Sequence, residues 1–475
     1  MQASTALTGI VACLQGLEHE LLLFVGFWFV IGALDEFAID ACWIVLRLTG
    51  RARDGFIGDA DAQAPLSGRA AVMIAAWSEA EVIGPTVRHA LAAWRQQDFT
   101  LYLGCYGNDP ATVEAAVEAA GSDGRVRLVI GEMAGPTTKA DCLNRIYEAL
   151  CADEQRQGRR YRSVIIHDAE DMVHPAALAV MDAGLARADF VQLPVLPELQ
   201  PQSPWVAAHY ADEFVESHGK AMVVRDALGA AIPAAGVGCG FSRGMIARIA
   251  RRRGDEGAHG GPFAAECLTE DYELGLLVRR EGGRSRFLRV RDEAGRLVAT
   301  RAYFPARLSD AVRQKSRWVH GIAFQGWDRL GWTRGFADTW MALRDRRGPL
   351  TAVVLACGYA LLAIEALLWI LAGQERSVVP DGLRVLLAIC LAGFVWRAAM
   401  RFVFTAREYG VIEGLGAIAR ILTGNLVAIL AGRRALAGYL KVLRGGGVHW
   451  EKTLHHGHPA LPDHRQADPQ EALAA

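Results

Sequence analysis

Long apolar runs near both ends of the chain most constrain what it can fold into. Residues 21–48 are apolar apart from a few charged positions, and two further apolar runs cover 351–372 and 385–404. Each run is long enough to cross a bilayer as a helix. The first has no basic region before it and no small-residue cleavage site after it, so we expect an uncleaved span rather than a signal peptide.

The charges beside these runs predict their direction. Arg47, Arg51 and Arg53 lie at or just after the end of the first run, and three arginines precede the second within 344–347. Arg and Lys are enriched at the cytoplasmic ends of membrane helices. We therefore expect the region between the runs to be cytoplasmic. The expected regions are a membrane helix in 1–50, a cytoplasmic domain in 51–347 with an interfacial helix near 313–340, and two membrane helices in 348–408.

Residues 411–443 are apolar enough to span, but Arg420, Asn425 and an Arg433–Arg434 pair interrupt them. We expect an amphipathic helix on the cytoplasmic face here rather than a fourth span. The region 409–475 then holds this helix and a polar, His-rich tail. Histidines 449, 455, 456 and 458 could bind a metal, but without a fixed acidic partner they are more often incidental.

Composition excludes several functions. The chain of 475 residues has 51 Lys and Arg against 52 Asp and Glu, so it lacks the basic excess that nucleic-acid binding needs. Its nine cysteines include no C-x-x-C pair, which argues against a disulfide framework and a zinc ribbon. A mean hydropathy of +0.16 fits a large polar domain tethered by a few membrane helices.

Strand and helix patterns alternate between the membrane segments. Apolar strands are expected at 70–76, 99–106, 125–130 and 162–167, each separated from the next by a helical pattern. This alternation predicts an α/β fold with a doubly wound parallel sheet, in which ligands bind at the carboxyl ends of the strands. The sheet region has neither G-x-G-x-x-G nor a P-loop, so a nicotinamide or ATP enzyme is not expected.

Acidic residues follow the strand at 162–167. Asp168, Glu170 and Asp171 lie within four positions, and like charges this close are commonly neutralised by a divalent cation. Mg²⁺ or Mn²⁺ held by one or two carboxylates completes its shell with water and phosphate oxygens, which predicts a phosphorylated substrate. Taken alone, the cluster is more simply a solvated acidic turn.

Two more motifs lie further along the chain. Glu270 and Asp271 follow Thr269 at the start of a helical stretch, where acids also favour the helix dipole. Gln314, Arg317 and Trp318 lie within about one helical turn. Arg can bind a diphosphate and Trp offers a flat face to a sugar, although a basic interfacial helix would explain the same residues.

In this order, the three motifs followed by membrane helices resemble the processive membrane-bound family 2 glycosyltransferases, the GT-A enzymes that include cellulose, chitin and hyaluronan synthases. The resemblance covers about 70–327. The strings ESHGKAMVVRDALGAAIP and RWVHGIAFQGW, and a W-x-K-T-x-H pattern at 450–455, are similar to the phage-adsorption protein B group of inner-membrane glycosyltransferases. Some members of that group have a C-terminal regulatory domain, which we do not expect here.

The resemblance implies a role for each motif. Asp271, beside Glu270, would be the general base, and Asp168 with Glu170 or Asp171 would hold Mg²⁺ or Mn²⁺ and the diphosphate. Ala75 and Ser78 replace the Pro and Asn usual in the family. The resemblance implies that the donor nucleotide contacts Trp77, Glu79, Asp109 and Lys139. It implies that the diphosphate and the acceptor contact Gln314, Arg317, Trp318 and Cys239, the last of which lies in the loop Gly238–Gly240.

The expected function is an inverting transfer of a sugar from a UDP-sugar to a growing envelope polysaccharide at the bacterial inner membrane. A UDP-N-acetylhexosamine is the expected donor. One base opposite the leaving group, with no second carboxylate nucleophile evident, predicts inversion. The alternatives are transfer of one sugar to a polyprenyl-phosphate carrier, or a non-catalytic envelope scaffold or phage-entry component. Because three spans are few to enclose a sugar channel, we expect export to need oligomerisation or a partner.

The apolar runs also contain charges. Counting the helical rise from the cytoplasmic ends places Asp40 and Arg397 at similar depths of about 12 Å, so we expect them to pair. Asp35, Glu36 and Glu365 would line a polar seam between helices, because isolated charges in a membrane are unfavourable. The alternative is that these acids lie nearer an interface.

Overall fold

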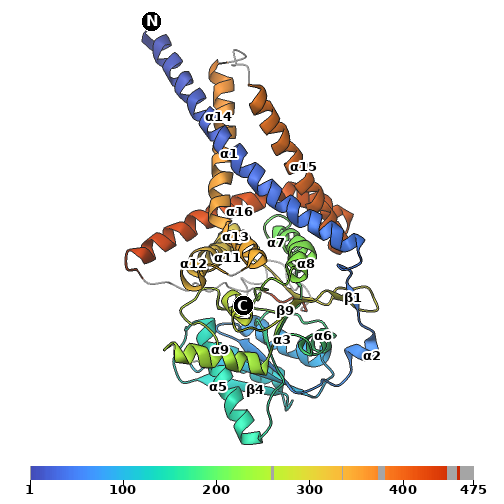
Figure 1. Cartoon of the computed structure of the whole chain (residues 1–475). Coiled ribbons are helices and arrows are strands. Elements are labelled where there is room, and N and C mark those ends of the chain that lie inside the picture. The colour runs from blue at the N-terminus through green and yellow to red at the C-terminus, as the bar shows by residue number, and fades with distance from the viewer. Residues whose placement is uncertain (1, 258–260, 334, 373–379, 447–456, 461–475) are drawn as a thin grey trace, which may run out of the picture.

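The computed structural model describes residues 2–257, 261–333, 335–372, 380–446 and 457–460. An α/β domain lies below a set of long helices, and the chain leaves and re-enters that domain through them (Figure 1). The domain organisation thus follows the alternation of polar and apolar regions in the sequence.

A seven-stranded sheet forms the centre of the domain, in the order β4-β3-β2-β5-β8-β6-β9. All strand pairs are parallel except those of β8 with β5 and β6. The α/β prediction is confirmed, but the sheet is mixed. The chain passes from β6 through helices at the carboxyl edge and re-enters the sheet from that edge, so β8 runs backwards. The strands are β2 (Ala70–Ala75), β3 (Phe99–Tyr106), β4 (Val126–Gly131), β5 (Ser163–His167), β6 (Phe190–Gln192), β8 (Cys239–Ser242) and β9 (Ser285–Phe287).

Helices cover both faces of the sheet. Val72 and Ile74 of β2 pack on one side and Ala71 and Met73 on the other, because successive side chains of a strand point to opposite faces. Burial of both faces explains why β2 is continuously apolar. The first face is covered by α3 (Ala80–Ala93), α4 (Pro110–Ala120) and α6 (Ala177–Leu185), and the second by α5 (Lys139–Gln157), α9 (Arg243–Asp255) and α10 (Glu270–Arg280).

Short elements connect the sheet to the long helices. At the carboxyl edge, α7 continues without a break into the π-helical turn η1 and then α8. The short helices are α2 (Asp59–Ala62), α7 (Val206–Glu216), η1 (Ser217–Ala221), α8 (Met222–Ala227), α11 (Leu308–Val319), η2 (His320–Gln325), α12 (Gly326–Leu330) and α13 (Phe336–Arg346); the strand pairs are β1 (Gly55–Phe56) with β10 (Val290–Arg291) and β7 (Val195–Pro197) with β11 (Thr300–Ala302).

Four helices in the described part of the chain are long and apolar enough to cross a membrane. They are α1 (Gln2–Leu48), α14 (Gly348–Ala372), α15 (Asp381–Tyr409) and α16 (Val411–Leu443). Figure 1 shows α1, α14 and α15 extending away from the α/β domain, while α16 runs across their base. Arg420 of α16 forms a buried ion pair with Asp212 of α7, with Nε 2.7 Å from Oδ2. The length and apolar composition of these four helices indicate that the protein associates with a membrane.

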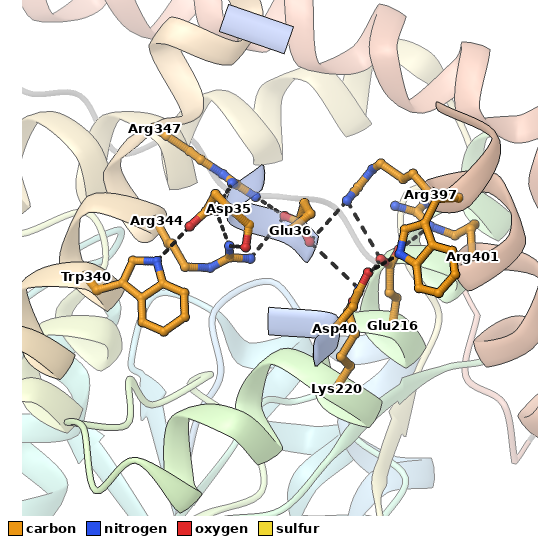
Figure 2. A network of polar contacts seen from close by, with 11 residues as sticks. Asp35, Glu36, Asp40, Glu216, Lys220, Trp340, Arg344, Arg347, Arg397 and Arg401 are labelled. Atoms are coloured by element: carbon orange, nitrogen blue, oxygen red, sulfur yellow. Dashed lines mark hydrogen bonds and ion pairs between the residues drawn. The ribbon is translucent and has the colours of Figure 1, made fainter. Parts of the chain in front are cut away.

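The charged residues of α1 pair differently from the prediction (Figure 2). Asp40 forms an ion pair with Lys220 of η1, with Oδ1 2.5 Å from Nζ, and its Oδ2 accepts a hydrogen bond from Nε1 of Trp396 at 2.8 Å. Arg397 instead lies 3.3 Å from Glu36. The predicted Asp40–Arg397 pair is therefore wrong. The end of α1 packs on the α/β domain, and cations of that domain reach its carboxylates.

The predicted polar seam is also changed. Asp35 and Glu36 form ion pairs with Arg344 and Arg347, which lie just before α14, instead of lining a seam together with Glu365. These acids are thus at the junction between membrane helices and the α/β domain. Helix length alone could not reveal these partners, because they depend on how the last turns of α1 pack on the α/β domain.

Candidate active site

A cavity of about 540 Å³ opens at the carboxyl edge of the sheet. It brings together residues from the strand ends, from α10 and from α11, which are far apart in the sequence. The predicted site residues that line it are Trp77, Glu79, Lys139, Asp168, Glu170, Asp171, Glu270, Asp271, Gln314, Arg317 and Trp318. A single space of this size is large enough for a nucleotide-sized ligand.

The acidic loop after β5 has two kinds of carboxylate. Asp171 is buried, and its Oδ2 accepts a hydrogen bond from the backbone N–H of Asp168 at 3.0 Å and lies 2.8 Å from Nδ1 of His167. Burial raises the pKa of Asp171, although His167 opposes the shift. Asp171 thus holds the loop in shape, whereas Asp168 and Glu170 are partly exposed on the cavity wall.

Lys139 begins α5 and lies opposite this loop. Thr138 and Asp141 form the predicted capping box, which fixes the first turn of the helix. The Lys139 ammonium contacts Asp168 Oδ1. Burial alone would lower the pKa of Lys139, but the carboxylates of Asp168, Glu270 and Asp271 raise it above its ordinary value. The site therefore attracts positive charge.

The carboxylates fit a divalent cation of the Mg²⁺ or Mn²⁺ class. In the part of the chain that the structure describes, no group of three or more His, Cys, Asp and Glu side chains is placed to hold a metal. Mg²⁺ commonly takes one or two carboxylates and completes its shell with phosphate oxygens and water. Asp168 and Glu170 provide such a pair, and the Lys139 ammonium occupies a position that a cation favours.

Of the tail histidines, 449, 455 and 456 lie outside the described residues, as does the W-x-K-T-x-H pattern.

Asp271 lies in the first turn of α10. Its Oδ1 accepts a hydrogen bond from the N–H of Tyr272 at 2.8 Å. Burial raises the pKa of Asp271, and burial together with the charge of Asp271 raises the pKa of Glu270 to about 7. A carboxylate whose pKa is raised accepts a proton more readily, so this pair is suited to general-base chemistry.

Glycines that sequence analysis missed bring the backbone close to this turn. Gly236 has a φ of +78°, and a Cβ there would lie closer than 3.0 Å to Asp271 Oδ2. A Cβ on Gly321 would be equally close to Thr269 Oγ1. The glycine-rich string that begins at Gly236 was the available signal, but the resemblance implied a contact only at Gly238–Gly240.

Gly275 of α10 provides a test of this packing. A Cβ there would lie closer than 3.0 Å to backbone atoms of Ile232, Pro233 and Ala234. We expect Gly275→Ala to lower the free energy of unfolding by about 1–3 kcal/mol, measured in detergent by thermal or denaturant unfolding. Gly244→Ala, also helical but with open space around its Cβ, should leave stability unchanged or raise it. Equal effects of the two changes would contradict the close approach.

The residues of α11 form the opposite wall. The Trp318 ring packs edge-on against Tyr210 and Phe214, with centroids 6.1 and 6.3 Å apart. Lys315 pairs with Glu213 of α7; burial opposes ionisation of Glu213, but Lys315 holds its pKa at about 2. Oε1 of Gln314 is buried and has no hydrogen-bond partner among the described residues. This wall thus offers an indole face and an amide oxygen to a ligand.

Two predicted site residues do not line the cavity. Asp109 caps α4, and its Oδ2 accepts a hydrogen bond from the N–H of Ser78 at 2.5 Å. Ser78 has a φ of +54°, a conformation that Asn adopts more readily, which explains why Asn is usual there in the resembled family. Cys239 is fully buried in β8, so its thiol cannot contact an acceptor. Asp109 therefore holds the backbone of Ser78, which lies between the cavity-lining residues Trp77 and Glu79. Cys239 lies in the sheet, behind the cavity wall.

Comparison with known proteins gives a consistent result. Residues 68–321 match the family described as "Glycosyltransferase like family 2". Bacteriophage adsorption protein B of Escherichia coli K12 is 33% identical over 457 residues, which cover 90% of this chain and 60% of the relative. Bacteriophage N4 adsorption protein B of Escherichia coli O157:H7 gives the same values. The chain thus spans about 60% of the length of the curated relatives it matches.

Solved structures with related architecture are more distant. A mannosyltransferase from Pyrobaculum calidifontis, in complex with GDP-Man and Mn²⁺, is 14% identical with a TM-score of 0.42; the match covers 88% of this chain and 99% of that one. Glucosyl-3-phosphoglycerate synthase of Mycobacterium tuberculosis is 17% identical with a TM-score of 0.33, covering 56% and 81%.

Proposed function

Because the chain belongs to glycosyltransferase-like family 2 and has a GT-A fold, we propose that it transfers a sugar from a UDP-sugar to a growing envelope polysaccharide. The observation that supports this most strongly is the meeting of Asp168, Asp271 and Trp318 in one cavity. These side chains are the ones that leaving-group stabilisation, proton acceptance and sugar stacking require.

The placement of these groups supports a single displacement at the donor sugar. Asp271 accepts the proton of the acceptor hydroxyl, whose oxygen attacks C1 of the donor sugar while the bond to UDP breaks. Arg317 stabilises the negative charge that develops on the departing diphosphate. A divalent cation held by Asp168 and Glu170 would add charge stabilisation at the same diphosphate when bound. A single displacement of this kind inverts the configuration at C1.

The two ends of the cavity suit different ligands. Trp77 and Lys139, beside β2 and α5, would contact the donor nucleotide, with Glu79 nearby. Trp318, Phe214 and the amide of Gln314 form a partly aromatic wall, which suits a sugar ring of the acceptor. A wall that binds a growing sugar chain favours repeated addition of sugars over transfer of a single sugar.

The test uses membranes that contain the full chain. They are incubated with radiolabelled UDP-sugars, UDP-N-acetylhexosamines first, in Mg²⁺ or Mn²⁺, and with EDTA as the metal-free control. We expect label in a long, non-extractable product that EDTA abolishes. A short product extracted into organic solvent would instead identify transfer to a polyprenyl-phosphate carrier. Absence of any product with every UDP-sugar would favour a non-catalytic envelope component and contradict the proposal.

We further propose that the α/β domain faces the cytoplasm of the bacterial inner membrane, with α16 lying on that face. The buried Arg420–Asp212 pair ties α16 to the domain, which a helix crossing the bilayer would make less easily. Trp327 of α12, Trp332 of the connecting loop and Phe336 of α13 are exposed and suit an interfacial position near 313–340. Export of a polymer would then need oligomerisation or a partner.

A further inference from the structure

The segment from α7 through η1 lies between the cavity and the membrane helices. One face of this segment contributes cavity-lining side chains, among them Phe214 and His218. The opposite face carries Glu216 and Lys220, which Figure 2 shows among carboxylates of α1 and arginines of α15. The same short stretch of chain therefore contacts both the site and the membrane anchor.

Lys220 and Asp40 are the most buried charges in this contact. The Lys220 side chain is 2% exposed, and Nζ lies 2.5 Å from Asp40 Oδ1 and 2.9 Å from Glu216 Oε1. Glu216 in turn accepts a hydrogen bond from Nε of Arg401 at 2.6 Å. A buried ammonium is stable only when it is paired, so the position of Asp40 on α1 constrains the position of η1.

The backbone of η1 is held at the same place. Nε1 of Trp43, on α1, donates a hydrogen bond to the carbonyl of Gly219 at 3.0 Å. A Cβ on Gly219 would lie 2.6 Å from Cδ1 of Phe404 on α15, so only glycine allows this approach. Turns of π-helix inside α-helices occur frequently at functional sites. Helices α1 and α15 thus both contact η1, and the other face of this turn lines the cavity.

A shift of η1 would also shift the wall of the cavity that Phe214 and Trp318 form on the acceptor side. The Phe214 ring lies 5.3 Å from the His218 ring and 6.3 Å from the Trp318 ring. Glu213, one residue earlier, pairs with Lys315 of α11. The position of α7 and η1 therefore sets the position of α11. The donor end of the cavity is built on β2, β5 and α5 instead.

We propose that Lys220 is a positioning residue that couples the packing of α1 and α15 to the acceptor side of the cavity. The name "acceptor side" rests on the proposed function, but the coupling itself does not. Breaking the Lys220–Asp40 pair increases the mobility of residues 213–222 and of α11, which packs against them. The donor side, built on β2, β5 and α5, keeps its structure.

The experiment uses the full chain in nanodiscs and compares Asp40→Asn, Lys220→Met and Lys220→Arg with the wild type. Arg252→Met, which breaks the ion pairs of a half-exposed arginine of α9 with Glu256 and Glu281, is the matched control. Hydrogen exchange is measured in 213–222, 308–319 and 163–171, and UDP affinity is measured with Mn²⁺. We expect exchange in the first two segments to rise about tenfold in Asp40→Asn and Lys220→Met, with 163–171 and UDP affinity unchanged. Lys220→Arg and Arg252→Met should resemble the wild type.

Unchanged exchange in 213–222 in Asp40→Asn would overturn the coupling, and so would a parallel loss of UDP affinity, which indicates general unfolding. Asp40→Asn keeps the test decisive if Lys220→Met does not accumulate as folded protein. Transfer per UDP-binding site, measured in the same samples, should fall about tenfold with the loosening. A wild type that transfers no sugar but shows the exchange response would contradict only the proposed function.

Discussion

Asp271→Asn is expected to lower the rate of sugar transfer about 10³-fold, while UDP still binds. The amide has nearly the shape of the carboxylate but cannot accept the proton of the acceptor hydroxyl. Because the Asp271 side chain lies in the first turn of α10 and bonds its own helix, the substitution should leave the fold intact. The measurement is transfer of radiolabel in membranes, normalised to UDP-binding sites.

The matched control is Asp255→Asn, at the exposed end of α9. It removes the same charge from the same domain and should transfer at the wild-type rate. Transfer by Asp271→Asn within a few-fold of the wild type would remove the general-base role from Asp271 and would leave Glu270, the adjoining carboxylate of the cavity, as the next residue to test.

Gly236→Ala is expected to lower transfer about 10²-fold, because the new methyl group would displace the Asp271 carboxylate by a substantial fraction of an ångström. The Michaelis constant for the donor should rise as the turnover number falls, since the new methyl group would also lie 3.4 Å from Nζ of Lys139, a proposed donor contact. Transfer kinetics at several UDP-sugar concentrations measure both quantities.

Gly282→Ala separates the two causes that act at Gly236. Gly282 has a φ of +75°, close to the +78° of Gly236, but a Cβ there meets open space. Both variants carry the strain of a left-handed alanine, so a similar loss of stability is expected in each. A loss of transfer as large in Gly282→Ala as in Gly236→Ala would show that strain, and not displacement of Asp271, is responsible.

Much of the fold could be predicted because its signals are local. Alternation of apolar strands with amphipathic helices identified β2 to β5 and α3 to α5. The reversal of β8 could not be predicted, because it depends on where the chain between β6 and β8 packs. Cys239 illustrates the same limit: its place in a glycine-rich string suggested a loop, but the residue pairs within the sheet and is buried.

The site was predictable where rules of topology apply. Asp168 and Trp77 follow strands, and the carboxyl ends of parallel strands meet at one edge. Partners of buried charges were not predictable in this way. Asp40 pairs with Lys220, which is distant in the sequence and belongs to the α/β domain, whereas helix depth alone suggested Arg397. Gly236 was missed because its role depends on a close approach that no spacing reveals.

If the separate motifs form one catalytic site, the cavity that they line binds the diphosphate of UDP. An experimental structure of the full chain in nanodiscs with UDP and Mn²⁺ is the decisive test. We expect nucleotide density in the cavity, with the diphosphate between Asp168 and Arg317 and the Asp271 carboxylate facing the open space beside it. Density for UDP elsewhere on the protein, or an empty cavity at saturating UDP, would contradict it.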